Sequence, residues 1–412
     1  MITTILLAAA LAVPGEVELK ARLPEVFARS VEHYKALDAA ATPLMKDAKG
    51  EVRFPHGFKR ATKEVDMRPV KWWTSGHFPG TLWYLYEATG DAALKDAALK
   101  WTEIVAPNAK VTDNHDVGFI MYCSFGNARR ILKTDRYDAL LRETADSLSK
   151  RYDEGLGLIR SWGFITNRTT FLVIPDNMMN LEILEAVSKM GQRASCPLQG
   201  DGANGRDARC PRDFDRIARS HADMTSRHHF REDGGVYHVL CYDPKTLRVR
   251  GIDRGQGASV ETAWSRGQSW AIYGYTMMYR ETKDPRYLER AVKSADFAIN
   301  NPNMPEDGVP YWDYGAPGEE RDTSAASVMA SALIELSSFV DGEKGKSYRA
   351  FAVHQLRSLA SDAYFSKGDE IGHFLLKHGV GHKPAGTEID TPLCYGDYYF
   401  VEALLRLRDM RR

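Results

Sequence analysis

Two kinds of hydrophobic pattern alternate along the chain, and both predict helices. In the first kind, apolar residues recur at helical spacing on one face, and charged residues occupy the other faces. A helix with one apolar stripe covers a core on that side and faces water on the other. Segments of this kind are 24–40, 91–105, 136–152, 214–230, 285–300 and 346–363.

Segments of the second kind are apolar on nearly every side, which is typical of buried helices. They are 77–88, 116–132, 176–190, 266–281, 322–339 and 396–408. The two sets interleave one for one, six times, and six buried helices inside six covering helices predict an all-α fold, the (α/α)6 barrel. Two unrelated helical domains are the alternative, but no Pro- or Ser-rich linker divides the segments. We therefore expect one barrel domain over residues 13–412.

Charge and cysteine content bear on which macromolecules, metals or cofactors the protein could bind. The chain carries 55 basic and 55 acidic residues, so its formal net charge is zero and nothing indicates a nucleic-acid or anionic-membrane partner. No stretch of the sequence is apolar for long enough to span a bilayer. The five Cys residues include no Cys-x-x-Cys pair, and neither a metal nor a cofactor is predicted.

The first residues resemble a secretory signal. Residues 2–13 are almost wholly apolar or small, and Ala10-Leu11-Ala12 matches a small-x-small cleavage site, although no Lys or Arg precedes them. We expect residues 1–12 to be a signal peptide and the protein to be periplasmic or secreted; an ordinary N-terminal strand in a cytoplasmic protein is the alternative. In an oxidising compartment, Cys196 and Cys210 could close the polar, Gly-rich segment 197–209 by a disulfide.

Two aspartates each open a helix of the buried set. Asp176 follows Pro175, and Asp116 precedes another apolar run. Either carboxylate could simply be an N-cap that accepts free backbone N–H groups. If the buried helices run parallel, however, both acids meet at one mouth of the barrel. The loops that enter these helices are rich in Trp, Tyr and charge, and aromatics around carboxylates are typical of a site that grips sugar rings.

Five longer motifs carry a resemblance to a known family. They read DNMMN at 176–180, WSRGQSWAIYGY at 264–275, VPYWD at 309–313, RDTSAA at 321–326 and GDYYF at 396–400. In register from about Trp73 to the C-terminus, the chain resembles glycoside hydrolase family 88, the unsaturated glucuronyl hydrolases. The (α/α)6 barrel of that family agrees with the helix count, which does not depend on the resemblance.

The resemblance implies an enzyme that releases a 4,5-unsaturated uronic acid from the non-reducing end of lyase-generated oligosaccharides, such as glycosaminoglycan disaccharides. It implies hydration of the C4=C5 enol ether: a proton reaches C4, water adds at C5, and the hemiketal opens and frees the neighbouring sugar. This chemistry needs one carboxyl group that gives a proton and takes one from water.

The motifs also assign roles. Asp176 matches the general acid/base, and Asp116 matches a second acid that orients substrate and raises the proton affinity of Asp176 through like-charge proximity. His238, Gln256 and Arg266 match positions that hold the sugar or the attacking water. The expected stacking residues are Trp73, Trp162, Trp264 and Trp270.

Several alternatives remain at this stage. An unsaturated rhamnogalacturonyl hydrolase would share the barrel and the chemistry, whereas a non-catalytic sugar-binding barrel would lose an acid, and both Asp116 and Asp176 are present. An α/α-barrel epimerase would need a pair of His at the mouth, and an inverting hydrolase of saturated glycans would need a Glu acid. Some family members bind a substrate sulfate with Ser and Lys near the C-terminus; segment 378–383 offers Lys383 but no Ser, which leaves a preference for sulfated disaccharides open.

Overall fold

The computed structural model describes residues 12–167, 169–192 and 213–410. The predicted signal peptide lies almost entirely outside these residues, and Cys196 and Cys210, with their predicted disulfide, lie wholly outside them. Within the described part, Cys123, Cys241 and Cys394 are free thiols. None of the described helices is long and apolar enough to cross a membrane.

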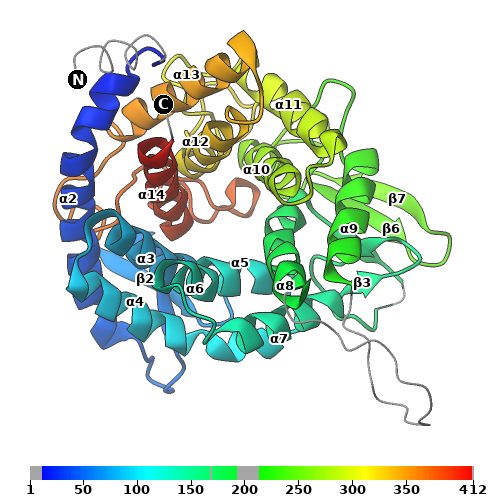
Figure 1. Cartoon of the computed structure of the whole chain (residues 1–412), viewed down its shortest axis with the longest axis horizontal. Helices are drawn as coiled ribbons and strands as arrows, with labels where there is room; N and C mark the ends of the chain where they lie inside the picture. Colours follow the sequence, from blue (N-terminus) through cyan, green and yellow to red (C-terminus); the bar gives the residue numbers. More distant parts are fainter. Residues whose placement is uncertain (1–11, 168, 193–212, 411–412) are drawn as a thin grey trace.

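An inner ring of helices forms the barrel, and its members match the six predicted buried segments (Figure 1). Each inner helix packs against ring neighbours on both flanks and against an outer helix, which explains its apolar character on every side. The second member contains a π-helical turn, and the third begins as a 3-10 helix. In chain order the ring consists of α3 (His77–Thr89), α5 (Val117–Met121) with η3 (Tyr122–Gly126) and α6 (Asn127–Leu132), η4 (Pro175–Leu181) with α8 (Glu182–Gln192), α10 (Ser265–Thr282), α12 (Thr323–Leu336) and α14 (Cys394–Asp409).

The outer ring matches the six predicted covering helices, and the largest shifts in boundaries fall on the first and the last, since the helix predicted over 346–363 spans Gly342–Leu359. The first outer helix begins at Glu16 instead of near Pro24, which lies inside it. Leu19 and Leu23 are buried against the core, and this packing extends the helix N-terminally past the proline that usually marks a start. The outer helices are α2 (Glu16–Ala41), α4 (Ala92–Ile104), α7 (Asp138–Ser149), α9 (Phe214–His228), α11 (Pro285–Ile299) and α13 (Gly342–Leu359).

Short links join inner to outer helices at one end of the barrel. Gly90, Lys133 and Lys283 adopt left-handed backbone and end α3, α6 and α10. The carboxylates of Asp91 and Asp284 then cap the following helices by accepting the backbone N–H groups of residues 93 and 286. These tight links fix the pairing of each inner helix with the next outer one.

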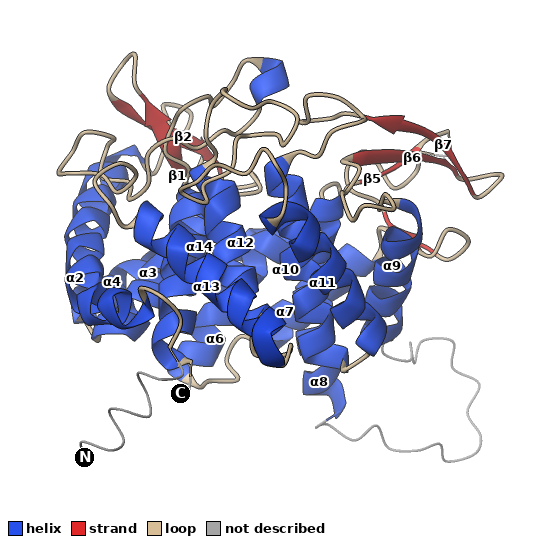
Figure 2. Ribbon diagram, turned by 90° about the horizontal axis from the view of Figure 1, so that it is seen from above, coloured by secondary structure: helices blue, strands red, loops and turns tan. Residues whose placement is uncertain are grey.

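The opposite rim carries all the described strands and the long loops, and the inner helices begin there (Figure 2). The buried helices therefore run parallel, which is the condition under which the two acids meet at one mouth, whereas the strands were not predicted. Three short 3-10 helices, η1 (Thr42–Leu44), η2 (Ala106–Lys110) and η5 (Lys383–Ala385), complete the connections. The strands form antiparallel sheets of β1 (Arg53–Lys59) with β2 (Glu64–Pro69), β3 (Tyr152–Asp153) with β4 (Leu158–Ile159), and β5 (Phe171–Val173) with β6 (Val239–Asp243) and β7 (Arg248–Asp253).

Candidate active site

Both predicted acids stand at the rim where the inner helices begin. Asp116 is the N-cap residue of α5, and Asp176 is the second residue of η4, after Pro175. The carboxylate of Asp116 accepts no capping hydrogen bond from its own fully described helix, and Oδ2 of Asp176 is buried without a hydrogen-bond partner among the described residues. The structure therefore argues against the simple capping role, which carboxylates elsewhere in the barrel do fill.

A close approach of two inner helices brings the acids together. Gly118 lies on α5 where a Cβ atom would stand 2.5 Å from Oδ1 of Asn180 and 2.8 Å from its Cα atom. The same Oδ1 accepts the backbone N–H of Phe119 at 2.7 Å, and the Asn180 amide also lowers the pKa of Asp116. Glycine is required here because the contact involves backbone atoms that cannot turn away.

Burial raises the pKa of both acids. Loss of hydration raises the pKa of Asp176 to about 7, and the positive charge of Arg266 partly opposes this shift. Burial, followed by the negative charge of Asp176, raises the pKa of Asp116 to about 8. Because each carboxylate disfavours ionisation of the other, the two acids titrate as a coupled pair that shares its first proton. An acid that keeps a proton near neutral pH can serve as a general acid.

His238 faces Asp176 with a defined tautomer. Nε2 of His238 lies 3.8 Å from Oδ2 of Asp176, and neither atom has a hydrogen-bond partner among the described residues. Nδ1 accepts the backbone N–H of Gln256 at 2.8 Å. Burial lowers the pKa of His238 to about 3, so the ring is neutral and its single proton sits on Nε2, toward the acid.

Arg266 connects the acid to three surrounding loops. Its guanidinium is buried and donates to Oδ2 of Asp322 at 3.0 Å, to Oε1 of Gln256 at 2.9 Å and to the carbonyl of Gly381 at 2.7 Å, and it also bonds the carbonyl of Val380. Its Nε has no hydrogen-bond partner in the described part of the chain. The guanidinium thus fixes the loops and leaves one donor unused.

The four predicted tryptophans differ in what they offer. Trp162 is 41 % exposed on the rim, and Trp73 is half-buried with its ring centroid 4.6 Å from that of Tyr395. Trp264 is buried, with its ring 4.4 Å from that of His238 and 4.4 Å from the Arg266 guanidinium carbon. Trp73 and Trp162 therefore suit a sugar ring, while Trp264 supports its neighbours.

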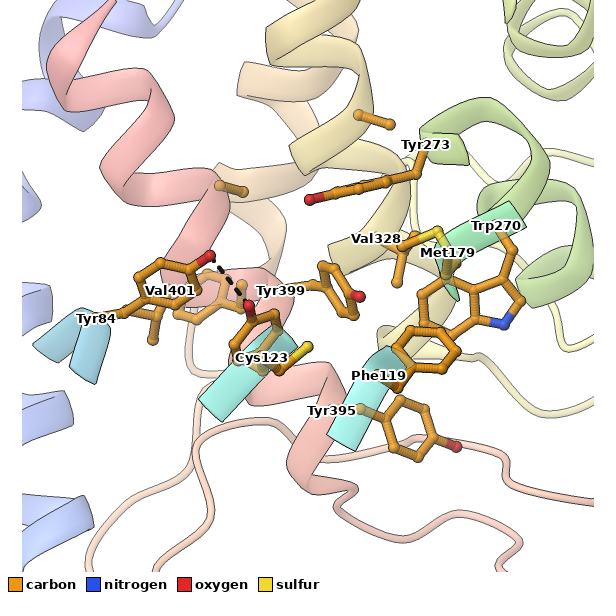
Figure 3. Packing of buried hydrophobic residues seen from close by; sticks show 14 of the residues in the cluster. Tyr84, Phe119, Cys123, Met179, Trp270, Tyr273, Val328, Tyr395, Tyr399 and Val401 are labelled. Atoms are coloured by element: carbon orange, nitrogen blue, oxygen red, sulfur yellow. Dashed lines mark hydrogen bonds between the residues drawn. The ribbon is translucent and has the colours of Figure 1, made fainter. Parts of the chain in front are cut away.

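Trp270 is wholly buried and offers no open face. Its ring lies beside Phe119 and near Tyr395 and Met179 in the packed interior (Figure 3). Its indole Nε1 has no hydrogen-bond partner among the described residues, yet it is placed to lower the pKa of Asp176. The structure makes Trp270 a polar donor beside the acid rather than the stacking platform that the sequence predicted.

A cavity of about 670 Å³ opens from this site along the rim. His238 and Gln256 bound it on the side of the acid, and Trp162 and His382 also line it. A second cavity, of about 430 Å³, lies lower in the barrel around Tyr84 and Glu402. It is lined by none of the predicted site residues, so we place substrate in the rim cavity.

Some supporting residues were not predicted. Arg151 is buried, donates to the carbonyl of Ser161 at 3.2 Å, and its charge lowers the pKa of Asp116. Asp322 was noticed only within a motif, yet it is fully buried and anchors Arg266. Arg151 carries no sequence signal of its own, since it ends a covering segment where Arg is ordinary.

One group of rim side chains has the composition of a cation site. Ligand atoms of His56, Asp66 and Glu388 lie within 4.8 Å of one another. Arg68 contacts both carboxylates, at 2.7 Å from Asp66 and 3.1 Å from Glu388. Its positive charge already occupies the position that a cation would take, so the group is an ion-pair network.

No family model matches the chain. Among characterised proteins, an unsaturated glucuronyl hydrolase of Formosa agariphila is 39% identical over 386 residues, which cover 92% of this chain and 90% of that protein. The chain belongs to the unsaturated glucuronyl hydrolases. An unsaturated chondroitin disaccharide hydrolase of Streptococcus pyogenes is 32% identical over 344 residues, 81% of this chain and 80% of that relative.

Solved structures of unsaturated glucuronyl hydrolases share the fold. The crystal structure of an unsaturated glucuronyl hydrolase specific for heparin superposes with a TM-score of 0.82 and 37% identity, covering 93% of this chain and 97% of that one. The resemblance in the sequence motifs and the (α/α)6 barrel are thereby confirmed. The chain is an unsaturated glucuronyl hydrolase by family and a glycoside hydrolase by activity.

Proposed function

We propose that this enzyme removes 4,5-unsaturated uronic acid from the non-reducing end of lyase-generated glycosaminoglycan disaccharides, with Asp176 as general acid/base. One observation carries the assignment. Buried polar atoms are nearly always hydrogen-bonded, yet Asp176 Oδ2, His238 Nε2, Arg266 Nε and Trp270 Nε1 all lack a hydrogen-bond partner among the described residues. One acidic oxygen faced by three donors suits an anionic, hydroxyl-rich ring.

The geometry supports hydration of the enol ether. The carboxyl group of Asp176, kept protonated near neutral pH by burial, delivers its proton to C4, and positive charge develops at C5. A distance of 3.8 Å between His238 Nε2 and Asp176 Oδ2 is too long for a direct hydrogen bond. One water beside the pair can bridge the two atoms, accepting from Nε2–H and donating to the carboxylate.

The water then adds to C5 while its proton passes to the Asp176 carboxylate, so the acid is restored and one water is consumed. The hemiketal opens, and the neighbouring sugar leaves. Asp116 shares the proton of the pair and orients the ring, and Arg266 supplies positive charge for the uronate carboxylate. A relative from Streptococcus pyogenes is named for chondroitin disaccharides, and one solved structure is described as specific for heparin, which supports glycosaminoglycan disaccharides as the substrate class.

The test follows the ultraviolet absorbance of the C4=C5 double bond during incubation with chondroitin, hyaluronan, heparin and rhamnogalacturonan lyase products. We expect the wild-type enzyme to abolish the absorbance of at least one product, and Asp176→Asn to lower kcat by about 10²- to 10⁴-fold. Circular dichroism of the variant controls for folding. Activity restricted to unsaturated rhamnogalacturonan products, or none on any product, would overturn the proposal.

A further inference from the structure

Arg250 places a positive charge on the wall of the rim cavity. Within the described residues no hydrogen bond or ion pair engages the guanidinium of Arg250. The positive charge of Arg250 helps to lower the pKa of Asp243, but the two side chains lie outside ion-pair distance. An exposed arginine is usually unremarkable, but this one stands on the wall of a cavity that His238, which faces Asp176, also lines.

A β-bulge places this arginine. In the β6–β7 ladder Tyr242 pairs with Val249, but the next residue, Cys241, pairs with Gly251. Arg250 is thus the extra residue of the bulge, and Arg250 and Gly251 stand together opposite Cys241. All three line the cavity. Bulges beside binding sites commonly re-aim a side chain.

The cavity walls near Arg250 suit a sugar ring. Trp162 and Ile252 each leave 41 % of their surface exposed, and both line the cavity. Because His238 and Gln256 bound the same cavity toward Asp176, a ring placed here is the sugar that leaves. Its substituents then face Arg250.

Other charges around the cavity are occupied. Lys383, which follows the cavity residue His382, forms ion pairs with Glu319 at 3.1 Å and with Glu320. The carboxylate of Asp253 accepts the backbone N–H of Gly255 at 2.7 Å. His382 is held neutral by burial, which lowers its pKa.

We propose that Arg250 binds a sulfate ester on the leaving sugar and sets the preference of the enzyme for sulfated disaccharides. The proposal rests on the proposed function and deepens it, since it names a substituent of the same substrate. The planar fork of a guanidinium can donate two parallel hydrogen bonds to two of the three terminal oxygens of a tetrahedral sulfate ester, and such charge-assisted bonds are strong.

The experiment compares kcat/KM for unsaturated disaccharides that differ only in sulfate on the hexosamine, using wild type, Arg250→Gln and Arg248→Gln. Arg248 is an exposed arginine on the same strand that does not line the cavity, so its variant makes the same change in net charge. We expect Arg250→Gln to lower kcat/KM for the preferred sulfated disaccharide by about tenfold and to leave the unsulfated one within about twofold. Arg248→Gln should keep the wild-type ratio.

Disaccharides with N-sulfate or 6-O-sulfate alone identify which position faces Arg250. The inference is overturned if Arg250→Gln lowers both substrates equally, if Arg248→Gln has the same effect, or if the wild type prefers the unsulfated disaccharide. In each of these cases hydration of unsulfated disaccharides would still uphold the proposed function. If wild type hydrates no disaccharide, the function itself fails and this inference fails with it.

Discussion

The imidazole of His238 presents its protonated Nε2 to Oδ2 of Asp176 across 3.8 Å. The backbone N–H of Gln256 fixes this tautomer by donating to Nδ1, and burial keeps the ring neutral. A water beside the pair can reach both atoms, accepting from Nε2–H and donating to the carboxylate that we propose deprotonates it. A charged or flipped imidazole would not provide this arrangement.

Replacing His238 tests that relationship. We expect His238→Phe to lower kcat by about 10²-fold, since the water loses its orienting donor. The variant should also raise the pKa of Asp176, because a donor facing its ionised form is lost. His238→Gln keeps a side-chain N–H and should retain more activity. Steady-state pH profiles of both variants measure the two effects; an unchanged kcat in His238→Phe would remove the histidine from the mechanism.

The helical frame could be predicted from the sequence, because burial on one face or on all faces leaves a direct trace in the pattern of apolar residues. The inner segment at 266–281, for example, differs from α10 by one residue at each end. The rim strands left no such trace, since several are only two or three residues long. Packing also extended α2 past Pro24, which local signals place at a helix start.

The site was predictable in its residues but not in its geometry. The motifs named Asp176 and His238, which lie 62 positions apart (238 − 176). Patterns in a single sequence do not show that the loop and strand around His238 bring it against Asp176. Trp270 shows the limit most clearly: its sequence context predicts a stacking face, while tertiary packing buries the ring and leaves only its N–H near the acid. The bulge at Arg250 depends on strand register, which no local pattern reveals.

The pH dependence of the enzyme should report the raised pKa of Asp176. The acid donates only when protonated, so kcat/KM should fall as pH rises through about 7, the value to which burial raises its pKa. In Asp116→Asn, we expect a lower kcat and an alkaline limb that moves to lower pH, because the negative charge of Asp116 no longer opposes the ionisation of Asp176. The movement should be modest, because burial is the main cause of the raised pKa of Asp176. An unchanged limb would contradict the like-charge role that the sequence motifs suggested.

Arg266 should affect both stability and the acid. Arg266→Met removes the charge partner of the buried Asp322 and should lower the free energy of unfolding by about 3–5 kcal/mol. It also removes the positive charge that lowers the pKa of Asp176, so the alkaline limb should move to higher pH. Arg266→Lys keeps the positive charge but loses the planar guanidinium fork. We expect its alkaline limb to stay at the wild-type pH and its affinity for substrate to fall. Thermal unfolding and pH profiles test these outcomes. If the alkaline limbs of both variants lie at the same pH, the charge of Arg266 does not influence the pKa of Asp176.

Gly118 should be hard to replace, although it has no side chain with which to contact substrate. In Gly118→Ala the new methyl would meet Oδ1 and Cα of Asn180 at 2.5 and 2.8 Å, and the backbone of η4 would have to move with the acid that it carries. We expect a loss of about 1–3 kcal/mol of stability from overpacking and a fall in kcat of about tenfold or more, because small displacements of reacting groups are costly. Gly251→Ala is the matched control for stability, since a Cβ atom there meets nothing within 4 Å. If Gly118→Ala unfolds at a lower temperature but keeps full kcat, the spacing of Asp116 and Asp176 is not what limits the reaction.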